Sequence, residues 1–115
     1  MLDVKQLDEE LLNGYLEQLD KSVIAKMLDL YLQQSRLYLD EISAAVEEDS
    51  QEQWQDRCHK MKGAAGSIGL KQLHAKLVMA EKFTEAQDQK RQLLAEILDL
   101  NDTAIAAFKA WLEQL

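Results

Sequence analysis

The feature that most constrains this chain is the absence of proline from all 115 residues, combined with apolar residues that recur at helical spacing. Leucine, alanine, glutamine, glutamate, aspartate and lysine dominate the composition, which favours helices over sheets. A chain of this length builds one domain around one core. The sequence therefore predicts an all-α fold in a single domain over residues 1–115.

Capping residues and apolar periodicity divide the chain into one short segment and four longer helices. Asp20 is the expected N-cap of the second helix, and Ser50 followed by Gln53 reads as a capping box before the third. Short connections between such helices predict an antiparallel up-and-down four-helix bundle with a short additional N-terminal helix. The expected helices cover residues 3–18, 21–48, 51–67, 70–85 and 88–114.

Apolar residues at helical spacing also predict the core of the bundle. The third helix is expected to bury Trp54, Cys58, Met61, Ala65 and Ile68 on one stripe. The last helix is expected to contribute Leu94, Ile97, Leu98, Ile105, Phe108, Trp111 and Leu112.

Charge is distributed unevenly along the chain. The formal net charge of −8 argues against a nucleic-acid partner, which requires clustered cations. Residues 57–82 nevertheless carry +5, from Arg57, Lys60, Lys62, Lys71, Lys76 and Lys82 against Glu81, whereas the remainder carries −13. This basic segment suggests attraction to a local anionic group on a partner. A solvated lysine-rich face explains it equally well.

The sequence predicts a cytoplasmic protein without direct membrane contact. No apolar run approaches the roughly 18 residues of a membrane span, and the acidic N-terminus lacks a signal-peptide pattern. The single Cys58 cannot form an internal disulfide, which fits a reducing compartment. Cys58, His59 and His74 are possible metal ligands by type, but Cys58 and His59 point about 100° apart on their helix, so no metal site is expected.

Residues 59–69, HKMKGAAGSIG, place one histidine and three glycines in a helix-favouring chain. At about 100° per residue, His59, Lys62, Gly63 and Gly66 lie on one face, roughly 130° from the apolar stripe. His59 is therefore expected to be exposed. Glycine weakens a helix by about 1 kcal/mol relative to alanine, so glycines beside His59 indicate that something approaches the backbone closely.

These residue types allow three functions. An exposed imidazole with a neighbouring lysine can act as a nucleophile for a phosphoryl group, with Lys62 offsetting its charge. A non-catalytic adaptor could use the glycine face to receive a partner helix. A small cofactor-binding bundle could use His59 as an axial ligand, which would require an inward-facing histidine. A merely solvated histidine is the common alternative to all three.

Residues 59–70, HKMKGAAGSIGL, resemble the signature of histidine-containing phosphotransfer (HPt) domains: a histidine, a spacer, an apolar residue, Lys-Gly, small residues and an apolar-Gly pair. The stretch is most similar to HPt domains at the C-terminus of tripartite hybrid sensor histidine kinases of the anoxic-respiration and trimethylamine N-oxide sensor type. The LDVKQLDEELL segment, the long second helix and the C-terminal helix also stand where this family has them, so the likeness extends over most of the chain.

The resemblance implies a phosphorelay intermediate of two-component signalling without kinase activity of its own. His59 would accept a phosphoryl group from the phospho-aspartate of a receiver domain and pass it to an aspartate of another receiver. Lys62 would stabilise the phosphoryl charge, and Gly63, extended by Gly66, would give the receiver room. Gly69 would form the helix-ending turn.

The same resemblance suggests how a partner docks and what it supplies. Arg57 and Lys60 would face the acidic active site of the receiver, and Glu81 would lie near the histidine. The receiver would bring Mg²⁺, so this chain needs no cofactor, and no glycine-rich nucleotide loop is present. We expect a monomer, and either a free protein or the cytosolic end of a membrane-bound sensor kinase.

Overall fold

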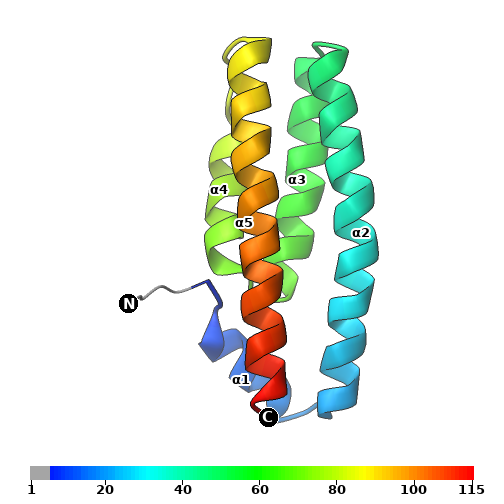
Figure 1. Cartoon of the computed structure of the whole chain (residues 1–115), viewed down its shortest axis with the longest axis vertical. Coiled ribbons are helices and arrows are strands. Elements are labelled where there is room, and N and C mark those ends of the chain that lie inside the picture. Colours follow the sequence, from blue (N-terminus) through cyan, green and yellow to red (C-terminus); the bar gives the residue numbers. More distant parts are fainter. Residues whose placement is uncertain (1–5) are drawn as a thin grey trace.

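The computed structural model describes residues 6–115 and consists of five helices. A short α1 (Glu9–Leu16) precedes four longer helices: α2 (Lys21–Glu47), α3 (Gln51–Ser67), α4 (Lys71–Glu81) and α5 (Gln87–Glu113). The four long helices run up and down in an antiparallel bundle, in which α3 packs against α2 and α4, and α5 packs against the same two helices (Figure 1). No strand occurs in residues 6–115, so the all-α prediction is confirmed.

The N-terminal helix starts later than predicted. Residues 3–5 lie outside the described part of the chain, and residues 6–8 are extended because Leu7 forms an isolated antiparallel bridge with Leu70. The Asp8 amide donates to the Gly69 carbonyl (2.8 Å), and the Asp8 carboxylate accepts from the Leu11 amide (3.1 Å). Asp8 is therefore the N-cap that sets the true start of α1.

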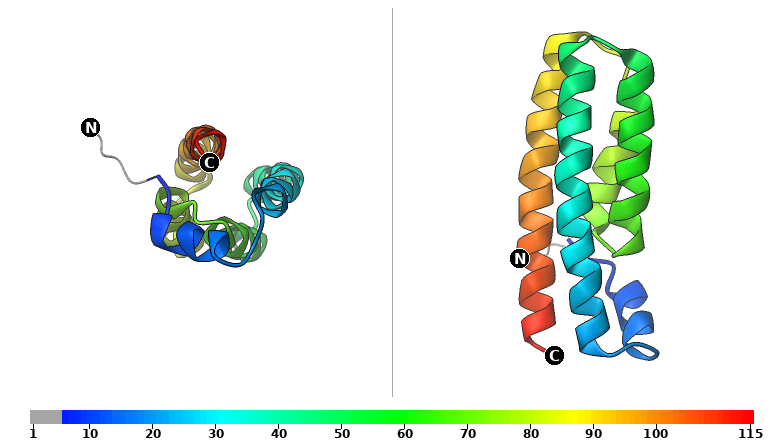
Figure 2. Two further views of the ribbon diagram at one scale, coloured as in Figure 1. Left: turned by 90° about the horizontal axis from the view of Figure 1, so that it is seen from below. Right: turned by 90° about the vertical axis from the view of Figure 1, so that its right-hand side faces the viewer.

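Helix α1 closes the end of the bundle at which α2 begins and α5 ends (Figure 2). The Tyr15 hydroxyl donates to the Ser67 carbonyl at the end of α3 (2.7 Å), and Leu12 is fully buried. This packing joins the N-terminal segment to the helix that carries the HKMKGAAGSIG stretch.

The boundaries of α2 and α3 agree with the prediction to within one residue. Asp20 is the N-cap of α2, although its side chain makes no capping hydrogen bond, and Ser50 accepts from the Gln53 amide as expected (3.2 Å). Helix α4 ends at Glu81 rather than near residue 85. Residues 82–86 instead form the connection to α5, and the carbonyls of Ala80 and Phe83 take hydrogen bonds from α3.

The core combines buried apolar residues of all five helices. All five predicted residues of the third helix are buried. In α5 the prediction was partly wrong, because Leu98 is 44% exposed and Leu94, Ile105, Trp111 and Leu112 are only partly buried. The buried stripe of α5 is instead Lys90, Leu93, Ile97, Asn101, Ala104 and Phe108.

Two polar residues lie on the buried stripe of α5 because each has a partner inside the bundle. Asn101 accepts a hydrogen bond from the Tyr31 hydroxyl (2.7 Å), and Lys90 contacts Gln51. Burial raises the pKa of Tyr31, so its hydroxyl stays protonated and remains a donor.

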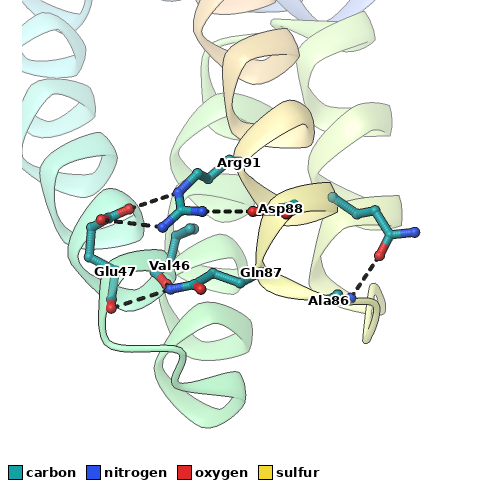
Figure 3. Close-up of polar contacts among 7 residues, drawn as sticks. Val46, Glu47, Ala86, Gln87, Asp88 and Arg91 are labelled. Atoms are coloured by element: carbon teal, nitrogen blue, oxygen red, sulfur yellow. Dashed lines mark hydrogen bonds and ion pairs between the residues drawn. The ribbon is translucent and has the colours of Figure 1, made fainter.

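The start of α5 is attached to the end of α2 by side chains. The Gln87 amide donates to the Val46 carbonyl (2.8 Å), and Arg91 bridges Glu47 and Asp88 (Figure 3). The Val46 carbonyl also accepts from the Asp49 amide (3.0 Å), so Gln87 adds a second hydrogen bond to the end of α2. Within residues 6–115, no helix is long and apolar enough to cross a membrane.

Candidate functional site

Helix α3 presents the two faces that its sequence predicts. Trp54, Cys58, Met61 and Ala65 are fully buried, whereas the side chain of His59 is 62% exposed. The exposed imidazole is incompatible with the axial-ligand alternative, which requires an inward-facing histidine. Among the described residues, no group of three or more potential metal-ligating side chains is present.

The site joins α3 to the last residue of α4. The Nδ1 atom of His59 lies 3.2 Å from Oε2 of Glu81, and the Lys62 ammonium lies 2.7 Å from Oε1 of the same carboxylate. Oε1 is shielded from solvent, and its contact with the Lys62 ammonium is an ion pair. Glu81 therefore contacts both candidate side chains of α3, whereas the resemblance placed it only near the histidine.

The contact with Glu81 determines how His59 can react. A carboxylate is only an acceptor, so Nδ1 must carry the proton that it shares with Glu81. The lone pair of the neutral ring then lies on Nε2, the nitrogen that is not in contact with Glu81. The Lys62 ammonium, and to a smaller extent His59, lower the pKa of Glu81, so the carboxylate is ionised at neutral pH.

Gly63 and Gly66 differ in their surroundings, although the sequence assigned both to one open face. A Cβ atom added at Gly63 would have nothing within 4 Å. A Cβ added at Gly66 would lie 2.9 Å from the His74 ring of α4. The open surroundings expected at Gly63 are present, and its use in docking stays a prediction. The clearance expected at Gly66 is absent: Gly66 allows α4 to pack closely against α3, and His74 is a half-buried packing residue.

Gly69 ends α3 as predicted. Its φ of 73° lies in the left-handed region, where a glycine has no Cβ penalty. Its carbonyl accepts from the Asp8 amide, so the turn also fixes the N-terminal segment.

The basic segment is less positive in space than in sequence. Arg57 contacts Asp56 and lies 3.6 Å from Glu41, and Lys60 lies 3.4 Å from Asp56. Lys62 and Lys76 also have acidic partners. Most of these cations therefore form ion pairs within the domain, which reduces the positive charge that the segment offers to a partner.

Cys58 precedes His59 in the chain but takes no part in its surface. Its side chain is fully buried, and burial, assisted by the nearby Glu81 charge, raises the pKa of the thiol to about 12. The thiol is therefore protonated and unreactive at neutral pH.

Sequence reasoning missed an apolar stripe on the outer face of α2. Val23, Leu30 and Leu37 are 39%, 55% and 58% exposed and are spaced by seven residues. Leu30 lines a hollow of about 120 Å³ together with Ala64 and Ser67 of α3. The seven-residue spacing was the signal available in the sequence.

Comparison with known proteins gives a family and a fold. Residues 26–115 match the family model of the Hpt domain. The structure is similar to that of the histidine-containing phosphotransfer domain of ArcB from Escherichia coli, with a TM-score of 0.84 and 22% sequence identity. That match covers 95% of this chain and 94% of the other. No curated protein matches the chain.

Proposed function

Because the chain belongs to the Hpt domain family and thus serves histidine phosphotransfer in a two-component phosphorelay, we propose that His59 carries the phosphoryl group. The observation that carries this proposal is the fixed imidazole. Nδ1 faces Glu81 at 3.2 Å, while most of the side chain remains exposed. The alternative of a non-catalytic adaptor gives no reason for a carboxylate at this nitrogen.

The proposed step is an attack of Nε2 of His59 on the phosphorus of a receiver phospho-aspartate. The new N–P bond forms as the P–O bond to the aspartyl carboxyl breaks, and the carboxylate leaves with that electron pair. The proton on Nδ1 stays in its contact with Glu81, whose negative charge balances the positive charge of the phosphorylated ring. The reverse step passes the group to another receiver aspartate.

Lys62 is proposed to stabilise the transferring phosphoryl oxygens. Its ammonium contacts the same Glu81 carboxylate as the imidazole, and it is proposed to turn from Glu81 to the phosphoryl oxygens during transfer. Phosphoryl transfer is mainly positioning and charge stabilisation, so most of the apparatus can belong to the partner. The receiver is proposed to supply Mg²⁺.

The receiver is proposed to dock over the exposed face of α3. The open surroundings of Gly63 give the backbone clearance this requires, and the apolar side chain of Leu30 adjoins the same face. Arg57 and Lys60 both contact Asp56 and are proposed to exchange it for acidic groups of the partner. We propose that the domain acts as a monomer in the cytoplasm, where its free Cys58 stays reduced.

The test is transfer of ³²P from purified receiver domains charged with labelled acetyl phosphate. Label on the wild-type chain should be acid-labile and alkali-stable, as expected of a phospho-histidine. His59→Gln should abolish it. His74→Gln is the matched control, because it removes the chain's other histidine, and it should keep the label.

Two results would contradict the proposal. If no charged receiver labels the wild type, the chain is not a phosphoryl acceptor. If label survives in His59→Gln, another residue accepts it. If the wild type is not labelled but His59→Gln still binds the receiver, the result would instead support the adaptor function.

A further inference from the structure

A lysine is buried at the end of the bundle where α4 ends and α5 begins. Lys90 is only 4% exposed and lies on the core stripe of α5. Its ammonium sits 5.7 Å from the centre of the Trp54 ring and donates to Oε1 of Gln51. Burying a cation is costly unless it is well paired, so these contacts require an explanation.

The Lys90 ammonium orients the amide of Gln51. With Oε1 bound to Lys90, the Nε2 group of Gln51 points the other way and donates to the Phe83 carbonyl (3.1 Å). Lys90 thereby sets the orientation of the Gln51 amide, with its Nε2 group toward the Phe83 carbonyl.

A second side chain of α3 holds the same segment. The indole Nε1 of Trp54 donates to the Ala80 carbonyl (2.8 Å). Ala80 precedes Glu81 in the chain and Phe83 follows it. The backbone on both sides of Glu81 is therefore hydrogen-bonded to α3. His59, which Glu81 contacts, is on α3 as well.

The end of α4 depends on these contacts. Helix ends leave carbonyls unpaired and fray, and α4 has no basic residue in its last turn. Its final turn is closed by hydrogen bonds from the Lys82 amide to Met79 and from the Phe83 amide to Ala80. Glu81 is thus the last residue of α4, at a helix end that has no basic side chain in its last turn to stabilise it.

We propose that Gln51, Trp54 and Lys90 are positioning residues for His59, acting through Glu81 by fixing the end of α4 to α3. This inference rests on the proposed role of His59 as phosphoryl acceptor. It gives the buried lysine a role in the site, although Lys90 itself does not touch the imidazole in the structure.

The test uses Gln51→Met, which keeps the side-chain length and removes the amide. Two measurements are made on ¹⁵N-labelled protein without any receiver: amide exchange of Phe83, and the Nδ1–H against Nε2–H tautomer balance of His59 from its ring ¹⁵N shifts. Phe83 exchange should rise, and the Nδ1–H to Nε2–H ratio should fall about threefold, as expected when an exposed charged contact loosens. Transfer should slow by a similar factor.

Gln87→Met is the matched control. Gln87 is also the first residue of its helix and donates its amide to a helix-end carbonyl, that of Val46 at the end of α2 (Figure 3). This variant should raise exchange at the end of α2 and leave the His59 tautomer unchanged. An equal tautomer change in Gln87→Met would reduce the effect to general destabilisation and overturn the proposal.

Lys90→Met is the second variant, because it removes a buried charge without leaving a cavity. It should shift the His59 tautomer in the same direction as Gln51→Met, even if the domain becomes more stable. The proposal is overturned if Phe83 exchange rises in Gln51→Met while the tautomer stays unchanged, or if exchange does not rise at all. Because the tautomer is read without a receiver, loss of labelling in the wild type would separately reject the proposed function.

Discussion

Gly63 and Gly66 stand three residues apart on α3, and they serve opposite purposes. Gly63 faces open space, whereas Gly66 leaves room for the His74 ring of α4. One glycine leaves the surface of α3 open, and the other lets two helices of the same domain approach. The difference teaches that a glycine in a helix indicates room beside the helix backbone. The sequence does not tell whether a second helix of the same domain occupies that room or whether it stays open.

The largest expected effect comes from filling the open side. Gly63→Leu should reduce phosphotransfer by about 100-fold, because misplacing the reacting groups by an ångström has effects of that size. Helix content by circular dichroism should be equal or higher, since Gly63 has no neighbour to displace. Normal transfer by Gly63→Leu would show that the open face is not used for docking.

Lys62 tests whether the cation on this face acts on the phosphoryl group or only holds α4 through Glu81. Lys62→Ala should slow transfer by about tenfold, because it removes a charge that stabilises the phosphoryl oxygens. The side chain is off the buried stripe, so the thermal transition should stay cooperative. Collapse of the circular dichroism signal would instead assign Lys62 a structural role.

Filling the packed side should change stability rather than transfer. Gly66→Ala places a methyl group against the His74 ring and should destabilise the domain by about 1–2 kcal/mol. In a His74→Ala background, the same change should stabilise by about 1 kcal/mol, because only the helix propensity of alanine remains. Denaturant titrations of the four proteins measure this, and additive effects would contradict the contact.

The smallest effect concerns the link between the two helices at Glu81. Lys62, and then His59, lower the pKa of Glu81 from its ordinary 4.5. Because the folded pKa is the lower one, this contact stabilises the fold above about pH 4.5, and the contribution is lost as the pH falls further.

Glu81→Gln should therefore be less stable than the wild type at neutral pH, by under about 1 kcal/mol for an exposed ion pair. The difference should shrink at about pH 3, below the ordinary pKa of 4.5, because protonation of the carboxylate removes the contact. Urea titrations at the two pH values measure it. An equal difference at both would mean that the ionised carboxylate is not responsible.

The sequence was sufficient for the helices whose burial follows from apolar spacing alone. The two faces of α3 were predicted correctly because Trp54, Cys58, Met61 and Ala65 are all apolar and all buried. The left-handed turn at Gly69 was likewise predictable, since glycine is the residue that such a turn favours.

Polar residues that find partners inside the bundle could not be predicted. Lys90 and Asn101 occupy core positions on α5 because each forms a hydrogen bond there. Their partners, Gln51 and Tyr31, belong to other helices. Apolar spacing alone therefore selected Leu98, which is exposed. The contacts of Glu81 with His59 and of Gly66 with His74 have the same origin, because both depend on how α4 sits against α3.

The most direct test is heteronuclear NMR of the phosphorylated domain, which identifies the nitrogen that carries phosphorus. Nδ1 of His59 is occupied by its contact with Glu81, so the phosphoryl group should be on Nε2 of His59, with the proton retained on Nδ1. Phosphorus on Nδ1, or on either nitrogen of His74, would contradict the account.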